Sequence, residues 1–312
     1  MNKMVNPAFC ADILARQSQN RQNNEILNQA LQNVETKFFL FSDNFPFLIK
    51  NDKEIIVKTF NCHEINIENI SNAAPVYAGI SENCHVFLIN VKEDSKNYFC
   101  EKYSGEFINL RSILMQPKID QLEILGLGAS LFGWHKNHQF CVKCGNKTKL
   151  KDMGFSSFCE KCETEHYPRI DPVVIMLVLK DDKCLFGRSK EFPENLYSIL
   201  AGFVEPCETI EQACRREVLE ETNIEIGDVK IIGNQPWPFI SQLMIGLEAQ
   251  ALSDKITINE NELEDAIWLS KPQVRQLLSK DGLELNGRQI FGPRKIAIAN
   301  SLVNYWLDNN KD

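Results

Sequence analysis

Three glutamates, Glu217, Glu220 and Glu221, have the spacing of neighbours on one face of a helix. Thr209 and Gln212 form a capping-box pattern, which predicts a helix that begins there and continues through Glu221. Like charges on one helix face repel each other unless something neutralises them. A hard cation such as Mg²⁺ or Mn²⁺ would do so, because such ions prefer oxygen ligands. If only these three residues were considered, a solvated acidic face would be the simpler interpretation.

Four of the eleven cysteines form two Cys-x-x-Cys pairs separated by fourteen residues. Two such pairs can complete a tetrahedron of thiolates around Zn²⁺. A tetrathiolate site leaves no open position for water, so we expect a structural zinc ion that stabilises a segment too small for its own core. The predicted zinc ligands are Cys141, Cys144, Cys159 and Cys162. Since four thiolates satisfy the ion, we expect the nearby His135, His138 and His166 to be packing or surface residues.

The chain has 312 residues, a length that suggests two domains and a smaller third. The pattern of apolar residues predicts strands at 37–41, 54–60 and 86–91, a helix at 119–135, and a buried strand at 173–179. We therefore divide the chain into an N-terminal α+β domain (1–138), a zinc ribbon (139–168) and a C-terminal domain (169–312) that alternates strands and helices.

Composition narrows the class of protein. With 34 basic and 42 acidic residues, the formal charge is −8, which argues against extensive binding of a phosphate backbone but leaves room for a local basic patch. The longest apolar run has seven residues, whereas a membrane-spanning helix needs about 20. No secretory signal is evident, and we expect a cytoplasmic protein that does not engage a membrane.

Residues 202–224 resemble the Nudix box, Gly-x5-Glu-x7-Arg-Glu-U-x-Glu-Glu-x-Gly-U, in which U is apolar. Every defined position matches except Asn223, which replaces a glycine just after the helix. Asn is the second choice for a left-handed helix end, so we expect the turn to be kept.

The resemblance implies metal-dependent hydrolysis of a nucleoside diphosphate linked to another group. By matched position, Glu217 and Glu221 would be metal ligands and Glu220 a further ligand or a proton acceptor. Glu208 and Arg216 would form an ion pair between loop and helix.

A second motif, Asn234-Gln-Pro-Trp-Pro-Phe-Ile-Ser-Gln242, resembles the Ser-Gln-Pro-Trp-Pro-Phe-Pro-x-Ser array of zinc-containing NADH pyrophosphatases, a family that includes hydrolases of NAD-capped RNA. It departs from that array at Asn234, Ile240 and Gln242. Two prolines stiffen the backbone, and aromatic faces can stack on a flat ring. Taken alone, the motif would equally suit a buried aromatic cluster. The resemblance implies substrate binding by Gln235, Pro236, Trp237, Pro238, Phe239, Ile240, Ser241 and Gln242.

The resemblance extends from about residue 140 to the end of the chain and implies further site residues. Tyr167 would stack on the substrate, and Ala299 would contact it through the backbone. Ala201, through its carbonyl, and Glu262, through its carboxylate, would complete the Mg²⁺ or Mn²⁺ site. In the less similar N-terminal domain, Arg111 is a further substrate-binding candidate.

The implied fold is α/β: a Nudix α/β/α sandwich with a mixed sheet, preceded by the zinc ribbon and an N-terminal α+β domain. The implied activity is hydrolysis of NAD(H) to NMN(H) and AMP, together with removal of NAD caps from the 5′ end of RNA, by a homodimer that needs Mg²⁺ or Mn²⁺ and one structural Zn²⁺ per chain. Two alternatives stay open. One is a Nudix hydrolase of ADP-ribose or a diadenosine polyphosphate, and the other is a non-catalytic zinc-ribbon module that binds RNA or protein.

Overall fold

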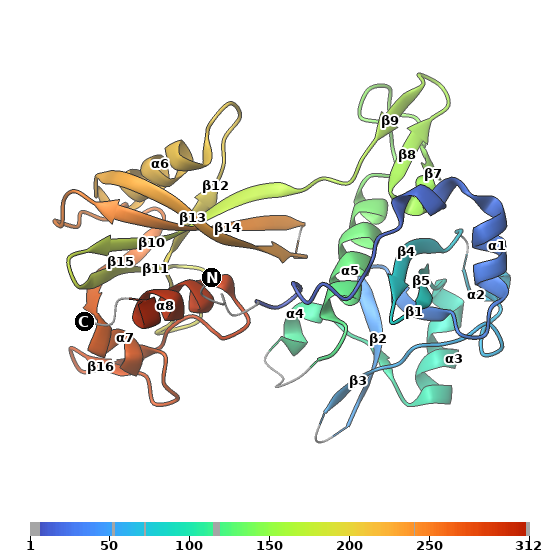
Figure 1. Ribbon diagram of the computed structural model, residues 1–312, viewed down its shortest axis with the longest axis horizontal. Helices are drawn as coiled ribbons and strands as arrows, with labels where there is room; N and C mark the ends of the chain where they lie inside the picture. The colour runs from blue at the N-terminus through green and yellow to red at the C-terminus, as the bar shows by residue number, and fades with distance from the viewer. Residues whose placement is uncertain (1–6, 52–53, 72, 115–118, 240, 310–312) are drawn as a thin grey trace. The chain divides into compact units, whose positions relative to one another are not determined.

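The computed structural model describes residues 7–51, 54–71, 73–114, 119–239 and 241–309 (Figure 1). They divide into two compact units. The N-terminal unit contains residues 9–169 and 237–241, and the C-terminal unit contains residues 170–236 and 242–309 together with residues 7–8. None of the described helices is long and apolar enough to cross a membrane.

The N-terminal unit is built on a sheet with the strand order β3-β2-β1-β5-β4, and β6 also pairs with β2. The central pair, β1 (Lys37–Ser42) and β5 (Cys84–Asn90), is parallel, whereas the other pairs along this order are antiparallel. The remaining elements are η1 (Ser18–Gln22), α1 (Asn24–Gln32), β2 (Phe45–Lys50), β3 (Ile55–Val57), α2 (Ile67–Ile70), β4 (Val76–Ser81), α3 (Glu93–Tyr103), β6 (Glu106–Phe107), α4 (Leu110–Ile113) and α5 (Leu122–Asn137).

The strands predicted at 37–41 and 86–91 and the helix predicted at 119–135 are confirmed as β1, β5 and α5. The strand predicted at 54–60 is wrong in extent, because only Ile55–Val57 pairs with β2 while Phe60 forms an isolated bridge to Phe38. Gly128 explains how α5 approaches the sheet. A Cβ atom at this position would lie 2.2 Å from the ring of Phe41, so a larger residue would push the helix away.

The cysteine segment follows α5 and forms a three-stranded antiparallel sheet in the order β7-β8-β9. Its elements are β7 (Lys149–Lys151), η2 (Asp152–Gly154), β8 (Ser156–Cys159) and β9 (Thr164–His166). All of these residues belong to the N-terminal unit.

The C-terminal unit has a mixed sheet in the order β13-β14-β10-β11-β15, with β12 also paired to β10. Strand β10 (Asp171–Lys180) runs parallel to β14 (Gln242–Ala251) and antiparallel to β11 (Lys183–Ser189) and β12 (Leu200–Phe203). The other elements are α6 (Ile210–Thr222), β13 (Ile226–Trp237), β15 (Leu263–Ser270), α7 (Lys271–Leu277), β16 (Leu283–Leu285), β17 (Arg288–Ile290) and α8 (Ile298–Asn309).

Both faces of β10 are buried, which confirms the strand expected at 173–179. Val174, Met176 and Val178 share one apolar cluster with residues of α6. Ile175 and Leu177 point to the opposite face, in a second cluster with residues of α7 and α8. Because side chains alternate across a strand, one continuous apolar run serves both clusters. The result is the expected sandwich of helices on both sides of a mixed sheet (Figure 1).

Candidate functional site

Helix α6 carries the three glutamates, and its ends match the sequence pattern. The Thr209 hydroxyl accepts a hydrogen bond from the Gln212 backbone N–H at 3.2 Å, and the Gln212 side chain accepts one from the Thr209 N–H at 2.8 Å. This reciprocal pair confirms the capping box. At the other end, Asn223 has φ 59° and ψ 24°, which confirms the left-handed turn expected there.

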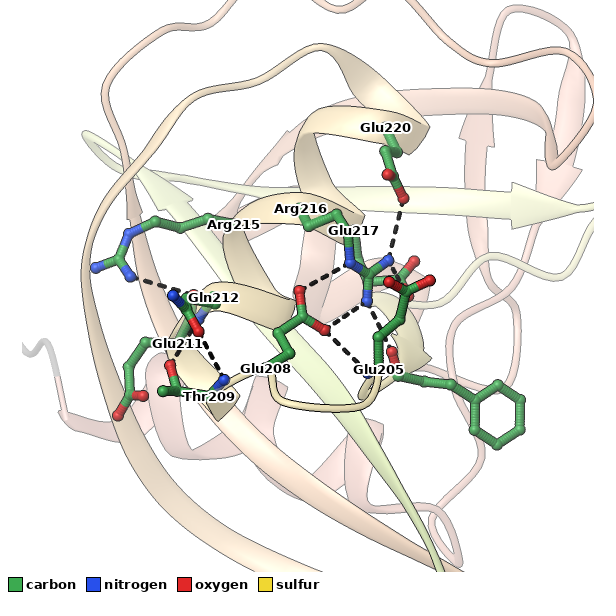
Figure 2. Close-up of polar contacts among 10 residues, drawn as sticks. Glu205, Glu208, Thr209, Glu211, Gln212, Arg215, Arg216, Glu217 and Glu220 are labelled. Carbon is green, nitrogen blue, oxygen red and sulfur yellow. Dashed lines mark hydrogen bonds and ion pairs between the residues drawn. The ribbon is translucent and has the colours of Figure 1, made fainter.

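Arg216 fastens this helix to the loop before it (Figure 2). Its guanidinium donates to both carboxylate oxygens of Glu208, at 2.8 and 2.9 Å, and to the Phe203 carbonyl at 2.8 Å. Glu208 also accepts a bond from the Glu205 N–H at 3.0 Å. The bond from Arg216 is the main cause that lowers the pKa of Glu208. The expected ion pair between loop and helix is thus present, in a bidentate form.

Glu217, Glu221 and Glu262 converge, with one carboxylate oxygen of each lying within 4.8 Å of the others. Two backbone bonds place Glu262 there, because the N–H groups of Thr257 and Asn259 donate to the carbonyls of Thr222 and Glu221 at the end of α6. Glu262 then directly precedes β15. The cluster therefore joins residues about forty positions apart in the chain.

Glu221 is the buried member of this cluster. It is 7% exposed, and its Oε2 atom has no hydrogen-bond partner among the described residues. Burial, followed by the nearby charges of Glu217 and Glu262, raises the pKa of Glu221 to about 8. Burial likewise raises the pKa of Glu217. A buried carboxylate oxygen with no donor is costly unless something else binds it, so this donor set fits a divalent cation.

Gly202 makes room for Glu217, a function that the pattern of the box alone did not reveal. A Cβ atom at Gly202 would lie 1.9 Å from Cδ of Glu217, so the carboxylate rests directly against the backbone of β12. Ala201, whose carbonyl is the expected metal ligand, is the preceding residue of that strand.

Glu220 lies apart from the other two glutamates of the helix. Its side chain is about 50% exposed, and its Oε2 atom is 3.1 Å from Nη1 of Arg216, which also contacts Glu217 at 2.9 Å. The close carboxylate cluster does not include it, and Glu262 takes the third position. The structure therefore separates Glu220 from the two other glutamates that the sequence pattern placed on the same helix face.

The four cysteines also converge, with their Sγ atoms within 4.8 Å of one another. The closest approaches, 3.5 Å for Cys141 with Cys162 and 3.4 Å for Cys144 with Cys159, are far too long for disulfides. The Asn146 backbone N–H is the main cause that lowers the pKa of Cys144 to about 6. The backbone bond from Cys162 is outweighed by burial and the bond to Cys144, which raise the pKa of Cys159 to about 11, so the thiols share their protons unequally. Four converging thiols without S–S bonds fit a tetrahedral zinc ion.

The neighbouring histidines have other partners. A ring nitrogen of His135 lies 2.7 Å from the Gly154 carbonyl, and one of His138 lies 3.1 Å from the Trp134 carbonyl. The third, His166, places Nε2 3.3 Å from Sγ of Cys141. His166 thus contacts a predicted ligand, as residues around zinc sites often do.

In the predicted substrate array, Gln235 is placed differently from the expectation. Its side chain is completely buried, and its amide donates to the carbonyls of Ala8 and Ile296, at 3.0 and 2.9 Å, and accepts from the Ile298 N–H at 2.7 Å. An amide with this many internal bonds has little capacity left for a ligand. The Gln235 side chain instead holds together segments of the C-terminal unit, including the start of α8.

The aromatic part of the array belongs to the N-terminal unit. Trp237 and Phe239 pack edge to face, with ring centroids 5.1 Å apart, and Phe9 contacts both rings at 6.3 and 6.1 Å. Both aromatic side chains of the array are half-buried, while Pro236 is exposed and Pro238 is buried. The Arg111 guanidinium lies 6.0 Å from the centre of the Phe239 ring, which places this candidate beside the array. No sequence pattern pointed to Phe9.

The other predicted substrate residues are spread over both units. Tyr167 is 67% exposed and lines a cavity of the N-terminal unit, and Ser241 lies in a left-handed conformation in the same unit. In the C-terminal unit, Gln242 begins β14, and Ala299 is 2% exposed within the cluster around α8. Ile240 lies outside the described residues.

Three family models match successive parts of the chain. The model described as "NUDIX domain" matches residues 169–288, and "NADH pyrophosphatase zinc ribbon domain" matches residues 136–167. The "NADH pyrophosphatase-like rudimentary NUDIX domain" matches residues 35–134, a relationship that the sequence patterns did not reveal.

Curated relatives agree with these models. The chain is 33% identical to the human protein named "NAD-capped RNA hydrolase NUDT12", over 97% of this chain and 73% of that protein. It is 36% identical to the human "NAD(P)H pyrophosphatase NUDT13, mitochondrial", over 65% of this chain and 60% of that protein. For several other relatives, the chain spans about half of their length. Among solved structures, a NUDIX hydrolase from Nitrosomonas europaea aligns with 22% identity and a TM-score of 0.41, over 55% of this chain and 92% of the other.

Proposed function

From the fact that this chain belongs to the Nudix hydrolase family, with the zinc ribbon of NADH pyrophosphatases, we propose that it hydrolyses the pyrophosphate of NAD(H) to NMN(H) and AMP. Cleavage of the same bond at the 5′ end of a transcript would remove an NAD cap. The observation that carries the proposal is the convergence of Glu217, Glu221 and Glu262, in which the buried Oε2 atom of Glu221 has no hydrogen-bond partner in the part of the chain that the structure describes. The names of the relatives support the choice of substrate.

The carboxylates of Glu217, Glu221 and Glu262 and the carbonyl of Ala201 would hold Mg²⁺ or Mn²⁺. When bound, such an ion withdraws charge from a pyrophosphate and lowers the pKa of water. The chain itself fixes the ligands. Arg216 orients Glu217 from one side, and the absence of a side chain at Gly202 admits it from the other.

Glu220 is our candidate for the proton acceptor. It is half-exposed and lies outside the close cluster of carboxylates. Its Oε2 atom is 3.1 Å from Nη1 of Arg216. In the proposed reaction, a water oxygen bonds to phosphorus while its proton passes to Glu220. The bridging P–O bond then breaks, and the two products are mononucleotides.

The proposed recognition of NAD(H) uses aromatic rings. Trp237 and Phe239 form a rigid pair between prolines, and Tyr167 offers an exposed ring. Flat bases and pyridine rings stack on such surfaces. We assign further contacts to Arg111, beside Phe239, and to the backbone of Ala299. Pro236, Pro238, Ile240, Ser241 and Gln242 complete the proposed array.

We propose a structural role for Zn²⁺ in the zinc ribbon. The proposed domain boundaries along the sequence are 1–138 for the N-terminal domain, 139–168 for the ribbon and 169–312 for the Nudix domain. No cysteine among the described residues forms a disulfide, which supports a reducing compartment such as the cytoplasm. A homodimer is the proposed assembly on the basis of the family resemblance alone. Light scattering on the purified protein tests it by distinguishing one chain of 35.8 kDa from two.

The decisive experiment is product analysis with purified, zinc-loaded protein. NADH, NAD⁺, ADP-ribose, a diadenosine polyphosphate and NAD-capped RNA are each incubated with Mg²⁺ or Mn²⁺. We expect NMNH and AMP from NADH, and a loss of at least about 100-fold in kcat for Glu217→Gln. The matched control is Glu211→Gln, in the first turn of the same helix, which should keep its activity.

A higher kcat/KM for ADP-ribose or the diadenosine polyphosphate would replace NAD(H) as the assigned substrate. If the folded, zinc-loaded protein turned over none of these compounds, a non-catalytic binding module would be the better description.

A further inference from the structure

A basic, exposed segment runs along the zinc ribbon and has no part in the chemistry described above. Residues 136–151 contain five lysines and no aspartate or glutamate, in a chain whose formal charge is −8. All five lysines are exposed: Lys136, Lys143, Lys147, Lys149 and Lys151. A local concentration of positive charge in an acidic protein is typical of a surface that meets an anionic partner.

Two of these lysines form neither an ion pair with a carboxylate nor a contact with an aromatic ring of the described residues. Lys136 pairs with Asp43, Lys149 pairs with Glu160, and Lys151 lies 4.3 Å from the centre of the Phe158 ring. Lys143 and Lys147 have no ion pair within the described parts of the chain. Lys143 is one of the two residues between the first pair of cysteines and therefore lies at the tip of the turn.

Exposed apolar side chains accompany these charges. Val142, beside Lys143 at the same tip, is 84% exposed, and Phe140 is 61% exposed. Both line a cavity of about 270 Å³, with Trp134 and Tyr167 also in its wall. Ligand pockets for drug-sized molecules begin at about 300 Å³, so this cavity suits a single flat ring.

Backbone contacts around the first pair of cysteines fix the position of Lys147 relative to Phe140. The Cys141 N–H donates to the Asn146 carbonyl at 2.7 Å, and the Thr148 N–H donates to the Gln139 carbonyl at 2.9 Å. Between these two bonds, Phe140 and Lys147 form an antiparallel bridge. An aromatic residue and a free positive charge therefore stand opposite each other on a closed turn.

The cavity also contains one carboxylate, which limits what can enter it. Glu165 accepts a hydrogen bond from Ser156 at 2.8 Å. Hydrogen bonds from Ser156 and then Tyr167 lower the pKa of Glu165, so it is ionised at neutral pH. An anionic carboxylate repels phosphate but accepts from an exocyclic amino group of a base. Arg169 also lines the cavity, so its charge is mixed. Glu165 offers an acceptor for a base there, and Lys143 and Lys147 outside the cavity offer positive charge for the phosphates.

We propose that this surface of the zinc ribbon binds the single-stranded RNA that follows the NAD cap, with one base against Phe140 and the adjoining phosphates near Lys143 and Lys147. The inference rests on the proposed function, which includes removal of an NAD cap from RNA and leaves Tyr167 to the NAD cap itself. Stacking on aromatic rings combined with a line of positive charge is how proteins hold single strands. Free NAD(H) has no further phosphates to meet these lysines, so the surface discriminates capped RNA from the free dinucleotide.

The test compares two substrates in one protein. Lys143→Glu with Lys147→Glu should lower kcat/KM for NAD-capped single-stranded RNA by about tenfold at about 50 mM salt and leave kcat/KM for NADH unchanged. It should also reduce the slope of log kcat/KM for the RNA against log salt concentration by about 1 to 2. The matched control is Lys183→Glu with Lys280→Glu, which makes the same change of charge at two exposed lysines of the C-terminal unit and should affect neither substrate.

A binding measurement separates docking from catalysis. Fluorescence anisotropy with an uncapped 12-nucleotide RNA should show weaker binding for the double lysine variant and for Phe140→Leu. Phe140→Tyr, which keeps the ring, should bind like wild type. Zinc content is measured for every variant, so that a lost metal is not mistaken for a lost contact.

The outcomes distinguish this inference from the proposed function. If wild type hydrolyses neither NADH nor capped RNA, the proposed function fails. A second outcome is that wild type cleaves NADH but the zinc-loaded lysine variant has wild-type kcat/KM for both substrates, or an equal loss of kcat/KM for both. In either case, the assignment of this surface to RNA is wrong. A wild-type enzyme that cleaves NADH but not capped RNA would also overturn it.

Discussion

At the scale of single residues, Glu221 links the site to stability. Its pKa is about 8 in the folded chain and about 4.5 in an ordinary environment, so between these values the folded protein binds a proton that the unfolded chain has released. Stability therefore falls as pH rises from about 5 to about 8 in protein free of Mg²⁺ and Mn²⁺. The measurement is the urea midpoint across this range for wild type and Glu221→Gln, and the variant should show the flatter profile.

Two controls make the test of Glu221 specific. Glu211→Gln, on the same helix, should keep the wild-type pH profile. Added Mg²⁺ should stabilise wild type more at about pH 8 than at about pH 5, because the ion binds ionised carboxylates. Identical profiles for wild type and Glu221→Gln would show that another group causes the dependence.

Residues differ in how far the sequence could assign them. The glutamates of α6 and the four cysteines were predictable, because short, fixed spacings bring each set together. Glu262 required the family resemblance, since two backbone bonds from Thr257 and Asn259 bring a distant loop to α6. Gln235 shows what a local pattern cannot supply. The motif suggested a ligand contact, but its partners Ala8, Ile296 and Ile298 are far away in the chain.

At the scale of elements, the end of α6 tests whether Asn223 replaces glycine at low cost. Its φ of 59° is left-handed, and its N–H donates to the Leu219 carbonyl at 2.8 Å. Asn223→Ala should destabilise the protein by about 1 kcal/mol, because most side chains clash there. Asn223→Gly should stay within about 0.5 kcal/mol of wild type, since relief of strain is offset by a more flexible unfolded chain.

Urea unfolding provides the measurement for Asn223. Glu225→Ala, at a nearby exposed residue that is not left-handed, is the matched control and should change stability by less than about 0.5 kcal/mol. If Asn223→Ala were as stable as wild type, the left-handed turn would not depend on the identity of this residue.

The elements themselves were predictable wherever one physical pattern dominated. The apolar run at 173–179 gave β10, and the capping box gave α6. Strands β2 and β4 were not predicted, although they pair with β1 and β5. The resemblance of residues 35–134 to a rudimentary NUDIX domain was also missed, because that segment lacks the clustered glutamates that identify the box.

At the scale of the whole molecule, each unit has its own core. Phe38, Phe47 and Phe99 belong to a cluster within the N-terminal unit, and the two clusters around β10 belong to the C-terminal unit. Zinc would bind only in the first, through cysteines whose segment contributes few large apolar residues to a core. Metal binding to such a segment contributes directly to its folding free energy.

Removal of zinc should therefore destabilise one unit selectively. After treatment with a thiol-competitive chelator and return to Mg²⁺ buffer, calorimetry should show the transition of the N-terminal unit at a lower temperature, while that of the C-terminal unit moves little. Cys144→Ser should reproduce the shift without chelator, whereas Cys207→Ser, at an exposed cysteine of the C-terminal unit, should not. Equal shifts of both transitions would mean that zinc stabilises the two units as one cooperative body, and no shift would mean that the four cysteines do not need the ion to fold.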